Sequence, residues 1–353
     1  MPAIREFGSE FDWNANAAFM DSDRPQLNLE NAKKFRSGRD AMKAVARSGN
    51  GRYRRVLLPA LCCESMVSPF TMQGMEPVFY QLHPDYRANA LDVQKKMTED
   101  TIFVYGSYFG IDPFDEEYLS FLHRVFPHAL FLEDRTQDIL CPRENRVFTP
   151  DVTIASIRKW IPVPDGGLLW GRIDAETCAD DTFATLRKTA MMAKSQYLEN
   201  GDAALKDSFR HMLGEASECL DQSALPYGIT EASVRLLETL DFEKIYARRQ
   251  ANAKALLAAL KPDPAVLRLI THTPEKSTLY FPILVKDQAA VQSKLAKAGI
   301  YCPVIWPVPQ EALGVCETAE FTAEHMLGVP CDQRYTPEDM AYIGQEIMRI
   351  VYE

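Results

Sequence analysis

A regular alternation of strand-like and helix-like segments between Arg55 and Asp134 constrains the fold most strongly. Apolar, β-branched runs predict strands at 55–60, 76–82, 101–109 and 129–134, and the segments between them predict helices at 64–73, 91–97 and 113–126. Strands separated by helices of this length favour a mainly parallel sheet that is covered on both faces. Ligands of such α/β proteins bind at the carboxyl ends of the strands, so polar residues there are the first candidates for a site.

One lysine follows a later strand-like run. Residues 151–157 are apolar enough for a buried strand, and the prolines and glycines of 162–167 exclude a helix after it. Lys159 is therefore expected on a short irregular segment at the exit of a strand, with Ser156 three residues before it. A lysine in a partly desolvated pocket has a lowered pKa and becomes a nucleophilic amine, as covalent attachment of pyridoxal phosphate (PLP) requires. A lone lysine at such a place is more often an ordinary surface residue, so this hypothesis requires the other parts of a PLP site.

Those other parts occur earlier in the chain. Asp134 ends the predicted strand 129–134, where a carboxylate can keep the ring nitrogen of PLP protonated and so make the ring an electron sink. Gln137 follows three residues later and can point the same way. Ser37 is the expected N-cap of a helix that begins with Gly38-Arg39, and the free N–H groups and dipole of a helix start bind phosphate. A capped turn at Asp134 and an ordinary capped helix at Ser37 are the structural alternatives.

Composition excludes several classes of protein. The 353 residues carry a formal charge of −10 at pH 7, which argues against binding to nucleic acid through its phosphates. No apolar run approaches the roughly 18 to 20 residues of a membrane span, and the amino terminus has no apolar signal core, so we expect no membrane association and a cytoplasmic location. The eight cysteines show no C-x-x-C spacing, and no His-x-x-His pair occurs, so we expect no metal site.

The rest of the chain indicates a second, smaller unit. Residues 168–171 predict one more strand, 175–222 a strongly helical and charged run, and 230–260 one or two helices. Lys261-Pro262-Asp263-Pro264 marks a boundary. Beyond it the sequence predicts a strand at 277–285, a helix at 289–298, a strand at 301–305 and a helix at 337–351, which together form a small α+β unit.

Four motifs in order resemble one enzyme family. Ser37-Gly38-Arg39, Glu133-Asp134-x-x-Gln137, Ser156-x-x-Lys159 and Asp165-Gly166-Gly167 are similar to the DegT/DnrJ/StrS branch of fold-type I PLP enzymes, which are mostly sugar-nucleotide aminotransferases. The resemblance covers nearly the whole chain. It implies an α/β fold with a large PLP-binding domain at 37–240 and a small α+β domain made of 1–36 with 241–353. It also implies a homodimer with active sites at the subunit interface.

The resemblance assigns roles to individual residues. It implies that Lys159 forms the Schiff base and acts as general acid and base, and that Asp134 contacts the pyridine nitrogen. The remaining cofactor contacts that it implies are Gln137 to the ring and Ser156, Gly38 and Arg39 to the phosphate. Arg334, in the loop after Pro330, is a substrate candidate, because a guanidinium binds the α-carboxylate of an amino donor with two parallel hydrogen bonds. Its alternative is a pair with neighbouring Asp332.

The sequence also departs from the family pattern. Cys62-Cys63 stand near the position of an aromatic residue that often stacks on the cofactor, and Pro226-Tyr227-Gly228 stand where the family has a segment that reaches the partner's cofactor. We therefore expect a divergent member that retains fold and PLP better than substrate.

Three functional hypotheses follow. The first is an aminotransferase of sugar-nucleotide biosynthesis, which moves an amino group from a donor such as glutamate to a keto sugar or sugar nucleotide. The second is another PLP reaction on an amino acid, such as elimination or racemisation. The third is a PLP-binding sensor or scaffold without turnover.

Overall fold

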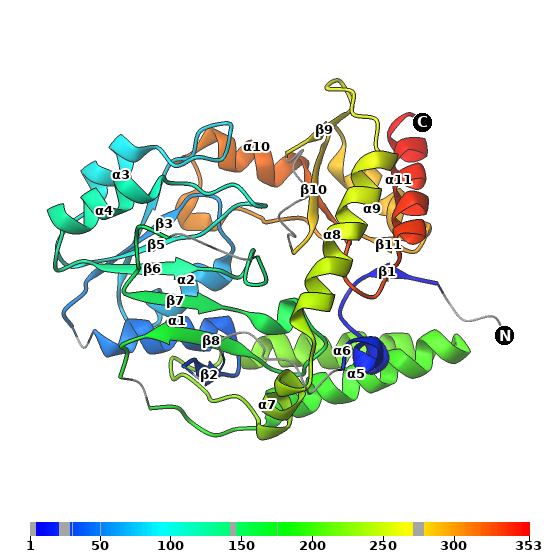
Figure 1. The fold of residues 1–353 in the computed structure, drawn as a ribbon, viewed down its shortest axis with the longest axis horizontal. Helices are drawn as coiled ribbons and strands as arrows, with labels where there is room; N and C mark the ends of the chain where they lie inside the picture. Colours follow the sequence, from blue (N-terminus) through cyan, green and yellow to red (C-terminus); the bar gives the residue numbers. More distant parts are fainter. Residues whose placement is uncertain are drawn as a thin grey trace.

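The computed structural model describes residues 5–20, 29, 31–49, 51–141, 146–174, 176–270 and 279–353. A seven-stranded sheet with its helices forms one part of the molecule, and smaller sheets with further helices form the other part (Figure 1). The predicted α/β fold with a mainly parallel sheet is confirmed.

The large sheet has the strand order β2-β8-β7-β6-β5-β3-β4. Its strands are β2 (Lys33–Phe35), β3 (Arg55–Pro59), β4 (Glu76–Tyr80), β5 (Thr101–Tyr105), β6 (Leu130–Asp134), β7 (Val152–Ala155) and β8 (Gly167–Gly171). Strands β3 to β7 are parallel, whereas β8 is antiparallel to β7 and β2 is antiparallel to β8. The carboxyl ends of the five parallel strands therefore meet at one edge of the sheet, where Asp134 ends β6 and Ser156 follows β7.

The helices around this sheet confirm the alternation expected from the sequence. They are α1 (Gly38–Ser48), α2 (Glu64–Thr71), α3 (Ala90–Lys96), α4 (Glu116–Val125), α5 (Thr182–Asn200), α6 (Ala203–Cys219) and α7 (Glu231–Glu238). Each strand and helix predicted between Arg55 and Asp134 is present, with ends that differ by a few residues. Helices cover the strands, so Leu57, Phe103 and Phe131 are fully buried, and each such side chain contributes about 2 kcal/mol of apolar burial.

The helical run predicted over 175–222 is two helices. Gly201 ends α5 in the left-handed conformation, with φ at 76°, and its N–H donates to the carbonyl of Tyr197. Asp202 then caps α6 by accepting a hydrogen bond from the N–H of Ala204. The run is interrupted at residue 201 because Gly readily adopts the left-handed conformation that ends a helix. The two helices pack side by side as a hairpin (Figure 1).

The smaller part combines both ends of the chain. Strand β1 (Phe7–Gly8) pairs with β11 (Ile300–Tyr301), and β12 (Met326–Val329), β10 (Phe281–Val285) and β9 (Leu267–Leu269) form an antiparallel sheet. Its helices are α8 (Phe242–Ala259), α9 (Gln288–Lys297), α10 (Glu317–His325) and α11 (Pro337–Val351). It has a hydrophobic core of its own, to which α8 and α11 contribute.

Three differences from the predicted elements concern this part. The strand predicted at 277–285 begins at Phe281, and its first two residues lie outside the described residues. The strand predicted at 301–305 is only the two-residue β11. Strand β2 pairs with the large sheet, although residues 1–36 were expected with the small domain. The division into two domains therefore remains a proposal, with the first boundary better drawn before Lys33.

Candidate active site

The start of α1 provides one wall of the site. The hydroxyl of Ser37 accepts a hydrogen bond from the N–H of Asp40 at 3.1 Å, as the predicted N-cap should. The first two helical N–H groups, those of Gly38 and Arg39, have no acceptor inside the helix. A Cβ added to Gly38 would lie 3.1 Å from the Cβ of Ser156, so glycine is what lets the helix start approach the end of β7. The arrangement forms a cradle for an anion.

Asp134, at the end of β6, provides a second wall. Its Oδ1 accepts a hydrogen bond from the N–H of Thr136 at 2.8 Å, and the hydroxyl of Thr136 accepts one from the N–H of Ser156 at 3.0 Å. These bonds fix the end of β6 to the end of β7. Burial raises the pKa of Asp134 above its ordinary value, against the opposing hydrogen bonds from Thr136 and the charge of Lys159. A cationic partner would stabilise this carboxylate in its ionised form.

Lys159 lies on a single 3-10 turn, Ile157–Lys159, directly after β7. The segment is thus an ordered turn rather than the irregular one expected. Buried Trp160 anchors the turn, because its indole N–H donates a hydrogen bond to the carbonyl of Thr136 at 2.6 Å. The carbonyl of Trp160 in turn accepts hydrogen bonds from Arg249 and Gln333 at 2.8 and 2.9 Å. The turn is therefore fixed by contacts from both parts of the fold.

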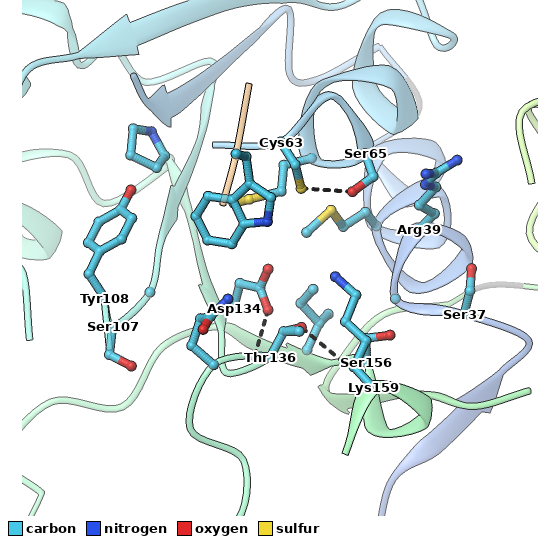
Figure 2. Close-up of a pocket in the computed structure, with 18 of the residues that line it drawn as sticks. Ser37, Arg39, Cys63, Ser65, Ser107, Tyr108, Asp134, Thr136, Ser156 and Lys159 are labelled. Carbon is cyan, nitrogen blue, oxygen red and sulfur yellow. Dashed lines mark hydrogen bonds between the residues drawn. The ribbon is translucent and has the colours of Figure 1, made fainter. Parts of the chain in front are cut away.

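These walls enclose a cavity of about 120 Å³. Figure 2 shows Lys159 and Asp134 pointing into it, with Ser37 and Arg39 on the side of α1 and Ser107 and Tyr108 on the opposite side. All six residues predicted to hold the cofactor line this one cavity: Gly38, Arg39, Asp134, Gln137, Ser156 and Lys159. The structure thus brings together residues of three of the four motifs, which are separated by up to 121 positions in the sequence, from residue 38 to residue 159.

The polar groups of the cavity suit PLP. Gln137 and Ser107 are only 8% and 4% exposed, yet in the described part of the chain the Oε1 of Gln137 and the hydroxyl of Ser107 have no hydrogen-bond partner. Buried polar atoms are normally paired, so these two indicate a ligand between them. An amine, a carboxylate and a helix N-terminus on separate walls match the aldehyde, ring nitrogen and phosphate of PLP.

A second, larger cleft of about 790 Å³ adjoins the cavity. Gln137, Arg158, Lys159 and Trp306 line both, so the two spaces are continuous at Lys159. The cleft reaches residues of the amino-terminal arm, of α6 and of the smaller part. Its volume lies in the range of small-molecule sites.

Arg334 lines the cleft and not the cavity. Its Nε and Nη2 each donate to a carboxylate oxygen of Asp332 at 2.8 Å, and two further bonds reach the carbonyls of Ser9 and Glu10. Burial alone would raise the pKa of Asp332, but Arg334 outweighs it and lowers that pKa. The structure therefore shows the pair that the sequence left as the alternative.

Sequence reasoning missed several residues of the cavity wall, among them Trp306 and Arg158. Trp306 comes from the smaller part of the chain and stacks on Phe109, with ring centroids 6.4 Å apart and planes at 23°. It brings an aromatic ring to a cavity in which Cys63 occupies the wall where an aromatic residue was expected. No local pattern around Trp306 indicates this contact. Arg158 lies beside Lys159 in the sequence and lines both spaces, so its position next to the lysine was an available signal.

The described residues offer neither a metal site nor a membrane-spanning helix. Within the described ranges, no group of three or more His, Cys, Asp or Glu side chains is arranged to hold a metal ion. No described helix combines the length and the apolar character that crossing a membrane needs.

Comparison with known proteins rests on the fold. The sequence matches no family model, and no curated protein matches it in sequence. Among solved structures, it is similar to Helicobacter pylori PseC, an aminotransferase involved in the biosynthesis of pseudoaminic acid, with 14% identity, coverage of 99% of this chain and 100% of that one, and a TM-score of 0.68.

Two further structures show the same likeness. The putative sugar aminotransferase Spr1654 of Streptococcus pneumoniae, in its PLP form, has 13% identity, coverage of 99% of each chain and a TM-score of 0.65. A DegT DnrJ EryC1 StrS aminotransferase from Brucella abortus has 17% identity, coverage of 93% of this chain and 87% of that one, and a TM-score of 0.62. Along nearly its whole length, the chain therefore has the fold of the DegT/DnrJ/EryC1/StrS aminotransferases, as the motifs predicted.

Proposed function

We propose that the protein is a PLP-dependent aminotransferase. The observation that carries the proposal is the meeting of the Lys159 amine, the Asp134 carboxylate and the start of α1 in one cavity. Bound PLP supplies an electron sink for charge that develops on the α-carbon of an amino acid. A fold shared with aminotransferases supports this role but does not carry it, since function depends on the site.

Each wall has a separate task in this proposal. Asp134 holds the proton on the ring nitrogen, and burial strengthens that ion pair because little water competes for the charges. The N–H groups at Gly38 and Arg39, together with the hydroxyl of Ser156, bind the phosphate. Gln137 contacts the ring. Lys159 attaches the cofactor and, once released, its Nζ moves the proton at the α-carbon of the donor.

The adjoining cleft is the proposed place of the substrates. Arg210 of α6 lines it, as does Lys206, which is paired with Glu6 at 2.6 Å, and polar side chains such as Gln292 and Ser293 lie on the wall formed by α9. Hydroxyl-rich and anionic groups suit such a lining, so a keto sugar or sugar nucleotide is the proposed acceptor and glutamate the proposed donor. The net charge of −10 does not oppose this, because local cations decide anion binding.

Assembly and location complete the proposal. We propose a homodimer with active sites at its interface and a cytoplasmic location. Sedimentation velocity of the purified protein with and without PLP measures the oligomeric state directly. A monomer in both conditions would contradict the dimer.

Glutamate should convert the bound cofactor from its aldehyde form to its amine form. Because no acceptor is present, one equivalent of 2-oxoglutarate should form per site and the reaction should then stop. Absorbance and product analysis after mixing holoprotein with glutamate measure both. Release of ammonia or loss of substrate chirality instead would indicate elimination or racemisation, and PLP binding without reaction with any amino donor would indicate a sensor.

Arg334→Lys should lower the free energy of unfolding and leave the KM for glutamate nearly unchanged. Lysine cannot reproduce the two parallel bonds to Asp332 or reach both carbonyls of the amino-terminal arm, so we expect a loss on the order of 1–3 kcal/mol. The pKa of Asp332 is lowered in the fold, so its contribution is present above its ordinary pKa and is lost as pH falls through the lowered value. Denaturant unfolding at neutral and acidic pH measures this. A KM that rises for glutamate alone would assign Arg334 to the donor carboxylate.

A further inference from the structure

We propose that Arg158 binds the phosphate of the cofactor through its guanidinium, as an anion-binding residue in addition to the start of α1. The inference rests on the proposed function of the cavity, and it names the residue that supplies the positive charge of the phosphate site.

Backbone contacts place Arg158 on the side of the cavity formed by the start of α1. It lies between Ser156 and Lys159 in the 3-10 turn, and its N–H donates to the carbonyl of Gly166 at 3.3 Å. The residue lines the cavity together with Ser37, Gly38 and Arg39. Its Cζ lies 5.6 Å from the centroid of the Phe183 ring, so the guanidinium lies beside α5.

The neighbouring cations all have partners. Arg36 pairs with Asp40 at 3.0 Å, Arg187 with Glu10 at 2.8 Å and Arg39 with Asp221 at 2.5 Å. Each of these three carboxylates is therefore already bound to another arginine.

Arg158 itself feels the charges of Glu10 and Asp40, but both carboxylates are paired with other arginines. Within the described ranges, its Nε is buried and has no hydrogen-bond partner. Burial, followed by repulsion from Arg187, lowers its pKa to about 10. Arg158 as a whole is half-buried, but a buried polar atom without a partner is uncommon, so its Nε favours an added anion as partner.

The chemistry around Arg158 favours a phosphate as that anion. The free N–H groups of Gly38 and Arg39 and the hydroxyl of Ser156 line the same cavity, so several donors converge on this side of it. In Figure 2, Ser37, Arg39 and Ser156 lie on this side, whereas Asp134 lies across the cavity. A planar guanidinium binds two phosphate oxygens through parallel hydrogen bonds. The two negative charges of a phosphate can balance both this cation and the positive end of the helix dipole. The α-carboxylate of a donor is the competing ligand, because Arg158 also borders the larger cleft.

Comparison of PLP with pyridoxal, which lacks the phosphate, tests the proposal. Apoprotein is titrated with each compound, and the dissociation constants are read from the visible absorbance of the lysine-bound ligand. Arg158→Met should weaken PLP on the order of 10- to 100-fold and leave pyridoxal unchanged. Arg158→Lys should restore part of the preference for PLP. Inorganic phosphate should raise the melting temperature of wild-type apoprotein more than that of Arg158→Met.

Arg187→Met is the matched control. Arg187 lies over the same Phe183 ring but pairs with Glu10, so its loss should change the ratio of PLP to pyridoxal affinity far less than Arg158→Met does. Equal weakening of both compounds by Arg158→Met and Arg158→Lys would overturn the proposal, since it would mean that Arg158 only supports the turn. Unchanged PLP affinity with weaker glutamate binding would also overturn it and assign Arg158 to the donor. Failure of wild-type protein to bind PLP is a different result, because it would refute the proposed function itself.

Discussion

Lys159→Ala is expected to abolish covalent attachment of PLP and to lower transamination by roughly 10⁴-fold or more. The amine is the group that bonds to the cofactor aldehyde, and it also moves the proton, so alanine removes two tasks at once. The fold should persist, because the side chain lies at the surface of a cavity while the turn is held by Trp160. Visible absorbance of the purified variant, its turnover and its melting temperature measure the three effects.

Lys194→Ala is the control for this experiment. Burial, and secondarily the charge of Arg334, lowers the pKa of Lys194 to about 8, so Lys194 is the lysine to compare with Lys159. Its Nζ, however, bonds to the carbonyl of Glu10 and does not line the cavity. Borohydride reduction of holoprotein followed by peptide mapping should label Lys159 and not Lys194. Label on Lys194, or retained absorbance in Lys159→Ala, would refute the assignment.

The cavity could be predicted from the sequence because its groups sit beside element ends with local signals. Asp134 closes a strand, Ser37 caps a helix, and Lys159 follows a strand before prolines and a glycine pair. A parallel sheet brings the carboxyl ends of its strands to one edge, so local placement was enough to bring these residues together. The structure adds their common cavity, while their catalytic roles remain proposals.

The substrate side could not be predicted in the same way. Trp306 and Arg334 reach the site from the smaller part of the chain, and their positions depend on packing between elements far apart in sequence. Whether Arg334 binds Asp332 or a donor carboxylate also depends on how deeply the two side chains are buried, and sequence spacing does not reveal burial. The break at Gly201-Asp202 had a local signal, a glycine followed by a capping residue, but the helical composition on both sides concealed it.

Asp134→Asn should bind PLP but lower turnover by about two to three orders of magnitude, the effect of removing one electrostatic partner from a reacting centre. An amide cannot hold a proton on the ring nitrogen as a carboxylate can, so the ring loses its strength as an electron sink. Thr136 should keep its hydrogen bond to the remaining side-chain oxygen, so the local geometry should persist. Stopped-flow measurement of the glutamate reaction tests this, and near-normal rates would mean that another group performs the task.

Asp134→Asn should also show that the Asp134 carboxylate destabilises the apoprotein. Burial raises its pKa above the ordinary value of 3.8, so the fold penalises the ionised form. For an acid with a raised pKa, the native contribution is fully present below the unfolded pKa and is lost as pH rises through the folded one. Asp134→Asn has no charge to bury, so the apo form of this variant should melt higher than wild-type apoprotein at neutral pH. The difference should disappear below about pH 4.

PLP brings the cation that compensates the carboxylate, so it should raise the melting temperature of wild type more than that of Asp134→Asn. Equal PLP shifts for the two proteins would contradict an ion pair between Asp134 and the ring.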